Sequence, residues 1–219
     1  MFTVHHLEKS RSTRILWLLE ELGVPYEVKR YARNPKTMLA PPELKAIHPL
    51  GKAPVVTDDG KVLAESAIIL DYILDTYGKG RFRPEAGTDE RRRYDYWMHY
   101  AEGSAMPPLL LKLIFGTVKR KAPWPIKPIA KAIANQVLSS FVDPALKTHF
   151  DWVESELGKS TWFVGDELTA ADMQMSYPVE AALVRADGAR PKMAAWLERV
   201  HARPAYKKAI EVGGPVLPS

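Results

Sequence analysis

The sequence contains no cysteine among its 219 residues, and this absence excludes more function classes than any other feature of its composition. Without cysteine the chain has no disulfide scaffold, no thiolate metal ligand and no cysteine nucleophile of its own. A reducing compartment suits such a composition, and we expect a cytoplasmic protein. Apolar residues make up 46% and charged residues 26%, which is typical of a folded globular chain rather than a disordered one.

Long apolar runs are also lacking. No uncharged apolar stretch reaches about 18 residues, because lysines interrupt the longest one, at 109–134. The sequence therefore predicts no membrane-spanning helix, and we expect no membrane partner. No charged segment followed by an apolar one precedes the first strand-like pattern, so we expect no secretory signal.

Acidic residues are missing from one long stretch. Residues 1–78 carry equal numbers of acids and bases, so the net charge of +5 arises after them. No acid occurs between Glu102 and Asp143, where six bases lie: Lys112, Lys119, Arg120, Lys121, Lys127 and Lys131. No nucleic-acid-binding motif accompanies these bases. We interpret the stretch as a solvated helical tip with a slight preference for anionic small molecules, and we expect no nucleic-acid partner.

Strand and helix patterns alternate through the first 78 residues. Apolar residues at helical spacing from Ile15 to Leu22, followed by Gly23, predict a helix that begins after Ser10 or Ser12. Strands are predicted at 2–7, 26–31, 54–57 and 61–64, a short helical turn within the proline-rich loop 41–49, and a helix at 68–77. The order βαβαββα contains one crossover and one hairpin, so the sheet must be mixed.

The pattern changes after residue 78. Segment 79–88 is rich in glycine, proline and charge, and predicts a linker between a domain at 1–78 and a domain at 89–219. Helical patterns follow: a long helix from Asp89 that is disturbed at Pro107 and Pro108, and another at 127–157. Thr169–Asp172 is a variant of the capping box that starts a helix. The second domain is therefore expected to be all helical.

Three separated segments carry a family resemblance. They read SRSTRILWLLEELG at 10–23, KAPVVTDDGKVLAES at 52–66 and GDELTAAD at 165–172. Their order, spacing and strand–helix context resemble the cytosolic glutathione transferases, and among them the bacterial and fungal-type members. The resemblance covers essentially the whole chain. It implies an α/β thioredoxin-like N-terminal domain with a mixed sheet, followed by an all-α helical-bundle C-terminal domain that lines the electrophile site.

The resemblance also implies an activity. A member of this family conjugates the thiolate of glutathione, its co-substrate, to small hydrophobic electrophiles in detoxification, without a metal. The resemblance does not decide whether glutathione-dependent peroxidase activity is also present. The alternative is a non-catalytic transferase-like protein that binds ligands or regulates a partner. A homodimer is implied as well, and the apolar residues Ile68, Ile69 and Tyr72 lie on adjacent faces of one predicted helix, where a second copy would cover one face.

The expected thiol activator is Ser10. A thiol with an ordinary pKa of about 8.5 is mostly protonated at neutral pH, whereas the thiolate is the nucleophile. Ser10 lies where a strand gives way to a helix, so its hydroxyl and the helix amides can both lower the pKa of a bound thiol. The alternatives are His5, at the strand position of the tyrosine-type members, Arg11 as a fixed positive charge, and Ser12.

Five further residues match the family's glutathione site. The resemblance implies that Pro54 is cis and presents the backbone of Val55 to the cysteinyl part of glutathione. It assigns Ser66 and the helix amides to the γ-glutamyl carboxylate, Glu65 to the ammonium group and Lys52 to the glycine carboxylate. The electrophile pocket is expected beside the helix after Asp89, and its lining candidates are Tyr100, Ser104, Met106 and Pro107. The sequence does not identify the second substrate.

Overall fold

Four strands form one mixed sheet in the computed structural model, which describes residues 1–217. β1 pairs in parallel with β2 and antiparallel with β3, and β3 pairs antiparallel with β4, so the strand order is β2-β1-β3-β4. The strands are β1 (Thr3–Leu7), β2 (Glu27–Tyr31), β3 (Val55–Asp58) and β4 (Lys61–Ala64). The predicted mixed sheet, with one crossover and one hairpin, is confirmed.

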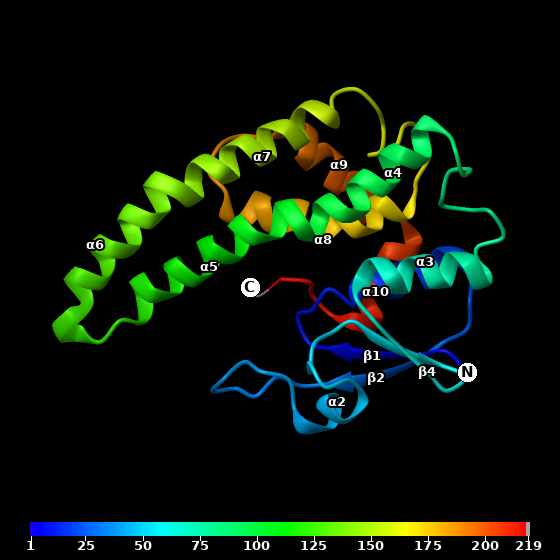
Figure 1. The fold of residues 1–219 in the computed structure, drawn as a ribbon, viewed down its shortest axis with the longest axis horizontal. Helices are drawn as coiled ribbons and strands as arrows, with labels where there is room; N and C mark the ends of the chain where they lie inside the picture. Colours follow the sequence, from blue (N-terminus) through cyan, green and yellow to red (C-terminus); the bar gives the residue numbers. More distant parts are fainter. Residues whose placement is uncertain (218–219) are drawn as a thin grey trace.

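Three helices accompany the sheet: α1 (Thr13–Leu22), α2 (Pro42–Ile47) and α3 (Ser66–Tyr77). α3 and α2 lie on opposite sides of the sheet (Figure 1). Gly23 ends α1 in the left-handed conformation, with φ of 69°. Asp59 and Gly60 both have positive φ, as a tight hairpin turn between β3 and β4 requires. The local signals of the sequence therefore set the ends of these elements.

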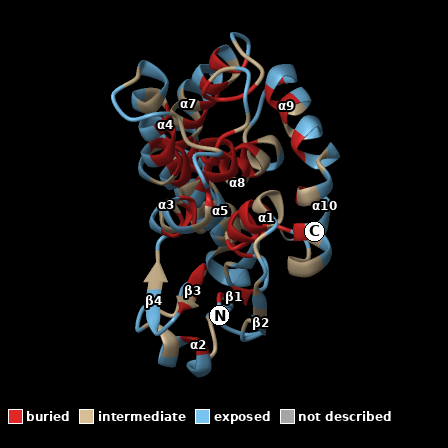
Figure 2. Cartoon of the chain, turned by 90° about the vertical axis from the view of Figure 1, so that its right-hand side faces the viewer, coloured by how far each residue is buried: buried red, intermediate tan, exposed pale blue. Residues whose placement is uncertain are grey.

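The rest of the chain is helical. It contains α4 (Asp89–Tyr100), α5 (Met106–Lys121), α6 (Lys127–Val137), α7 (Asp143–Glu156), α8 (Ala170–Arg185), α9 (Pro191–Ala202) and α10 (Pro204–Gly213). α8 lies at the centre of this bundle and is buried along most of its length (Figure 2). A thioredoxin-like α/β unit followed by a helical bundle is the fold class that the sequence predicts. None of the helices within residues 1–217 is long and apolar enough to cross a membrane.

Two of the predicted long helices are interrupted by π-helical turns. The first break lies at Ala101–Ala105, ahead of Pro107 and Pro108 rather than at them. The two prolines occupy the first turn of α5, where their missing N–H groups leave no hydrogen bond unmade. The expected continuous helix at 127–157 is likewise divided into α6 and α7 by Leu138–Val142. Hydrophobic spacing alone does not reveal an added residue in a helical turn.

The two units share one apolar core. α1 packs against α8 and α10, and the ring of Trp17 on α1 meets the edge of Tyr206 on α10. The predicted capping box at the start of α8 is present, because the Asp172 carboxylate accepts hydrogen bonds from both the backbone N–H and the hydroxyl of Thr169. The same carboxylate accepts from the backbone N–H of Phe163, so it also fixes the loop before α8.

Candidate functional site

The segment between α2 and α3 has two unusual backbone conformations. The peptide bond between Ala53 and Pro54 is cis, as the family resemblance implies, and Val55 follows as the first residue of β3. Glu65 has a φ of 72°, which is uncommon for a residue with a side chain and frequent at functional sites. Ser66 begins α3, so the amides of the first turn have no partner within the helix.

Two hollows that share lining residues meet at this segment. The smaller one, the inner recess, has a volume of about 90 Å³. The larger one, the open groove, has a volume of about 460 Å³. Lys52, Pro54, Glu65 and Ser66 line the inner recess, whereas Ser10 lines the open groove. Lys52 and Arg11 line both, so the two hollows form one site. The structure thus brings predicted residues of two distant segments, 10–23 and 52–66, together.

The charges in this site are divided by sign. The inner recess contains two carboxylates, those of Glu65 and Glu102, beside two bases. The charged residues that line the open groove are all bases: Lys9, Arg11, Arg33, Lys45 and Lys52. A ligand with an ammonium group at one end and carboxylate and thiolate groups toward the other would match both signs.

Ser10 belongs to a buried chain of hydroxyl and imidazole groups. Its Oγ lies 2.7 Å from Oγ of Ser12, which in turn lies 2.7 Å from Nδ1 of His6. Ser12 occupies the position before α1, yet its hydroxyl makes no cap hydrogen bond to the helix and is fully buried. Ser12 can therefore act on a ligand only through Ser10. Burial lowers the pKa of His6, and a backbone contact from Gly213 opposes that effect.

His5 lies elsewhere. Its Nδ1 is 2.9 Å from the hydroxyl of Tyr31 and its Nε2 is 3.2 Å from Oγ1 of Thr57, so both ring nitrogens already have partners. Burial, and then the charge of Lys29, lower the pKa of His5. Successive strand residues point to opposite faces of a sheet, and His5 and His6 accordingly have different surroundings. Neither hollow of the site includes His5.

An ion-pair cluster joins the two units at the inner recess. Glu102, in the π-helical turn, accepts hydrogen bonds from Nη1 of Arg11 at 2.6 Å and from Nη1 of Arg14 at 2.5 Å. Arg14 is almost fully buried and also contacts Gln174 of α8. Burial would raise the pKa of Glu102, but the charges of Arg14 and Arg11 outweigh it and hold that pKa below its usual value. Arg11 is therefore an ion-paired wall of the site.

The expected electrophile-pocket residues do not line either hollow in the described part of the chain. Tyr100 points into the bundle instead, where its hydroxyl lies 2.9 Å from Nδ1 of His149 and its ring stacks on Tyr96. Met106 is buried and Pro107 is exposed, both in the first turn of α5. Ser104 is half-buried within the π-helical turn, so the expected lining of the electrophile pocket stays a prediction.

The helical bundle contributes other residues that the sequence did not indicate. Leu110 on α5 and Tyr177 on α8 line the open groove, and Glu102 lines the inner recess. Leu110 and Tyr177 are far apart in the chain and lie in no motif, so only the tertiary fold could reveal them. Glu102 had a signal: Arg11 and Arg14 lie three residues apart at the start of α1, and a buried arginine needs a carboxylate partner.

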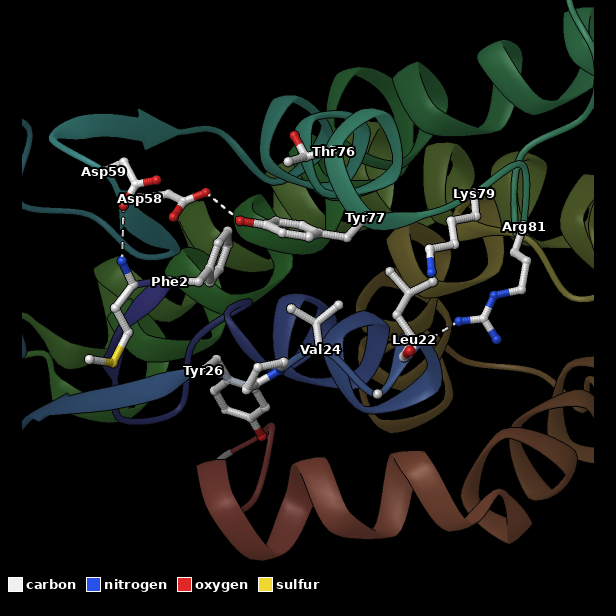
Figure 3. Close-up of a pocket in the computed structure, with 13 residues that line it drawn as sticks. Phe2, Leu22, Val24, Tyr26, Asp58, Asp59, Thr76, Tyr77, Lys79 and Arg81 are labelled. Atoms are coloured by element: carbon white, nitrogen blue, oxygen red, sulfur yellow. Dashed lines mark hydrogen bonds and ion pairs between the residues drawn. The ribbon is translucent and has the colours of Figure 1, made fainter.

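A larger hollow lies away from this site, beside the end of α1, the β3–β4 turn and the end of α3 (Figure 3). Its volume is about 860 Å³. Most of its polar groups already have partners: Asp58 accepts hydrogen bonds from the hydroxyls of Tyr72 and Tyr77, and Arg81 donates to the carbonyl of Leu22. It lacks the convergent free groups of the first site, so we assign the chemistry to the inner recess and open groove.

Comparison with known proteins agrees with this geometry. Residues 2–75 match the family model for the glutathione S-transferase N-terminal domain, and residues 132–199 match the model for the C-terminal domain. A glutathione S-transferase 3 of Schizosaccharomyces pombe is 36% identical over 96% of this chain and 87% of its own. A crystal structure of a glutathione S-transferase from Actinobacillus pleuropneumoniae is also 36% identical, with a TM-score of 0.76 over 97% of this chain and 93% of its own.

A more distant structure shares the fold. The glutathione transferase of Phanerochaete chrysosporium in complex with oxidized glutathione is 23% identical, with a TM-score of 0.76 over 98% of this chain and 97% of its own. Two family models and a relative that matches nearly end to end are all of glutathione S-transferases. The chain therefore belongs to the glutathione S-transferase family.

Proposed function

We propose that the protein binds glutathione in the inner recess and open groove and transfers its thiolate to small hydrophobic electrophiles. The observation that carries the proposal is that Ser66, Glu65 and Lys52 line the inner recess, and that Lys52 also lines the adjoining open groove together with Ser10. Glutathione has one ammonium and two carboxylate groups, and the signs of charge in the two hollows match that distribution. The Phanerochaete chrysosporium protein, which has the same fold, is in complex with oxidized glutathione.

The binding mode follows from the separate parts of the site. The Ser66 hydroxyl and the first-turn amides of α3 hold the γ-glutamyl carboxylate, since helix amides without partners favour anions. Glu65 pairs with the ammonium group. Pro54 presents the backbone of Val55 to the cysteinyl residue, and Lys52 pairs with the glycine carboxylate. Each of these roles places one end of the tripeptide, and together they direct its sulfur toward Ser10.

Thiol activation uses the chain of Ser10, Ser12 and His6. When His6 donates to Ser12 and Ser12 donates to Ser10, the proton of the Ser10 hydroxyl is free to donate to the sulfur. A hydrogen bond to the charged form lowers the pKa of the thiol. The thiolate sulfur then attacks the electrophilic carbon, an S–C bond forms, and the leaving group departs with its bonding electron pair. Leu110 and Tyr177 supply the apolar wall for the second substrate.

The second candidate function is a transferase-like protein that binds glutathione without turnover. The hydrogen bond between the Ser10 and Ser12 hydroxyls favours this second function if Ser10 is the donor, because its proton is then not available to a bound sulfur. A detoxification role in the cytoplasm, a homodimer and an added glutathione-dependent peroxidase activity belong to the first proposal as well.

Calorimetry with glutathione, together with turnover of a generic aryl halide, tests the proposal. The wild type should bind, and Ser66→Ala should weaken binding by about 1–3 kcal/mol, because a buried carboxylate loses a donor. Ser160→Ala, a hydroxyl loss in the helical unit, is the matched control and should leave affinity unchanged. Absence of glutathione binding by the wild type would overturn both candidate functions. Binding without turnover would exclude the transferase and support the binding protein.

A further inference from the structure

The connection between α5 and α6 projects away from the body of the molecule and carries the stretch without acids (Figure 1). We refer to residues 118–133 as the α5–α6 tip. α5 and α6 pack on each other there, and the 3₁₀ turn Trp124–Ile126 closes the hairpin. The tip therefore presents its outer side chains without cover from another part of residues 1–217.

Large apolar side chains are exposed on the tip. Trp124 is 86% exposed, although a tryptophan is usually largely buried in a folded protein. Ile126 ends the 3₁₀ turn, and Ile129 and Ile133, four residues apart, lie along one face of α6. All three are more than half exposed. Val118 at the end of α5 is exposed as well. Exposed apolar residues gathered in this way mark an interaction surface.

The tip also carries basic side chains. Lys112 lies in α5 outside the tip and is paired with Asp143 and Asp187. The five bases of the tip make no ion pair with any residue of 1–217: Lys119, Arg120, Lys121, Lys127 and Lys131. Lys127 and Lys131 lie one turn apart on α6, on nearly the opposite side of the helix from Ile129 and Ile133, as in an amphipathic interfacial helix. The partner of the tip must therefore be negatively charged and apolar at once.

We propose that the α5–α6 tip docks on the surface of a bilayer that contains anionic lipids. Basic residues attract the headgroups, isoleucine side chains enter the boundary of the acyl chains, and tryptophan prefers the headgroup level. The contact is interfacial, since no helix of the described chain can span a bilayer. This proposal departs from the sequence-based expectation of no membrane partner, because exposure of the isoleucine face is visible only in the fold.

Other occupants fit the tip less well. A symmetric contact between two tips would cover the isoleucine faces but would leave the unpaired bases without a counter-charge, since the tip contains no acid. A nucleic acid would satisfy the bases but would leave the isoleucine face in water, since its backbone offers no apolar counterpart. An anionic bilayer satisfies both the charge and the apolar area.

Vesicle sedimentation of the full-length protein tests the proposal. The protein should sediment with vesicles of phosphatidylcholine and phosphatidylserine and stay in solution with phosphatidylcholine alone, and added salt should release it. Arg120→Gln/Lys121→Gln should weaken partitioning about 25-fold, from about fivefold for each charge. Trp124→Ala should weaken it roughly tenfold. Lys192→Gln/Lys207→Gln removes two exposed bases elsewhere and should sediment like the wild type.

Several outcomes would overturn the proposal: no sedimentation, equal sedimentation with neutral vesicles, or equal losses for the tip pair and the Lys192/Lys207 pair. Tighter binding to a DNA duplex than to anionic vesicles would assign the tip to nucleic acid. A halved mass of Trp124→Ala in light scattering would assign it to a subunit interface. The test does not depend on the proposed activity, because lipid binding is measured without glutathione or electrophile.

Discussion

At the scale of single residues, the site depends on which way one proton points. Ser10 and Ser12 are within hydrogen-bond distance of each other, and His6 is the only imidazole in the chain that contacts this pair in residues 1–217. A neutral imidazole can either donate to Ser12 or accept from it. Donation by His6 frees the Ser10 proton for a bound sulfur, so His6 and Ser12 are positioning residues, whereas Ser10 touches the substrate.

The first prediction is that Ser10→Ala raises the pKa of bound glutathione by about one to two units, since each unit corresponds to about 1.4 kcal/mol. Turnover at pH 7 should fall about tenfold and recover in part at higher pH, because bulk deprotonation then supplies the thiolate. Thiolate absorbance against pH measures the shift, and glutathione affinity should stay nearly the same.

His5→Ala is the comparison for this experiment. Both ring nitrogens of His5 have partners outside the site, so its loss should leave the thiol pKa in place. If His5→Ala moves that pKa and Ser10→Ala does not, the assignment of the activator is wrong. If neither does, backbone amides and Arg11 hold the thiolate.

At the scale of elements, the end of α10 is fixed against the start of the site. A Cβ placed on Gly213 would lie 3.0 Å from Cδ1 of Leu16 and 3.1 Å from Cε1 of His6, and both neighbours are buried. α10 therefore approaches the sheet closely only because this position has no side chain. The same contact holds the His6 ring in place beneath Ser12.

The second prediction is that Gly213→Ala lowers the free energy of unfolding by about 1–3 kcal/mol, because overpacking forces buried groups apart. Gly116→Ala on α5 is the matched control: a Cβ there meets nothing within 4 Å, and alanine favours a helix by up to about 1 kcal/mol. Thermal unfolding should thus shift downward for the first variant and upward for the second. A Gly213→Ala variant as stable as the wild type would show that the packing at α10 is loose.

Local sequence patterns predicted some of these elements and not others. Turn signals such as Gly23 and Asp59–Gly60 act over a few residues, and each predicted its turn correctly. The π-helical turn at Ala101–Ala105 has no such local signal, and it changes which residues face the groove. Motif residues such as Pro54 and Ser66 could be placed in the site, whereas Leu110 and Tyr177 enter it through packing of α5 and α8 that no local pattern encodes.

At the scale of the whole molecule, one carboxylate ties the two units together. Glu102 of the helical unit is bound by Arg11 and Arg14 of the sheet unit, and Arg14 is almost entirely buried. Removal of one partner from a buried pair leaves a charge without compensation. The cluster thus contributes to the rigid placement of the groove wall.

The third prediction is that Glu102→Gln lowers the free energy of unfolding by about 3 kcal/mol at pH 7. The pKa of Glu102 is lowered in the folded state, so its stabilisation is present above the unfolded-state pKa of about 4.3 and is lost as the pH falls through the lower folded-state pKa. Urea unfolding should therefore show a larger difference between the two proteins at pH 7 than at pH 3. A constant difference between them would contradict the assignment.

The last prediction concerns assembly. Ile69 and Tyr72 of α3 face their own chain, Ile69 in the core and Tyr72 against Asp58, whereas Ile68 is 56% exposed. Val62 on β4 and Tyr96 on α4 are exposed apolar residues as well. We expect a symmetric dimer in which Ile68 of one copy packs on α4 of the other, so light scattering at micromolar concentration should report twice 24.6 kDa.

Ile68→Asp buries a charge in that contact and should weaken dimerisation by about 100-fold or more. Val184→Asp makes the same change at an exposed position of α8 and should leave the mass unchanged. A wild type that stays monomeric, or a dimer that survives Ile68→Asp, would place the exposed face of α3 outside any subunit contact.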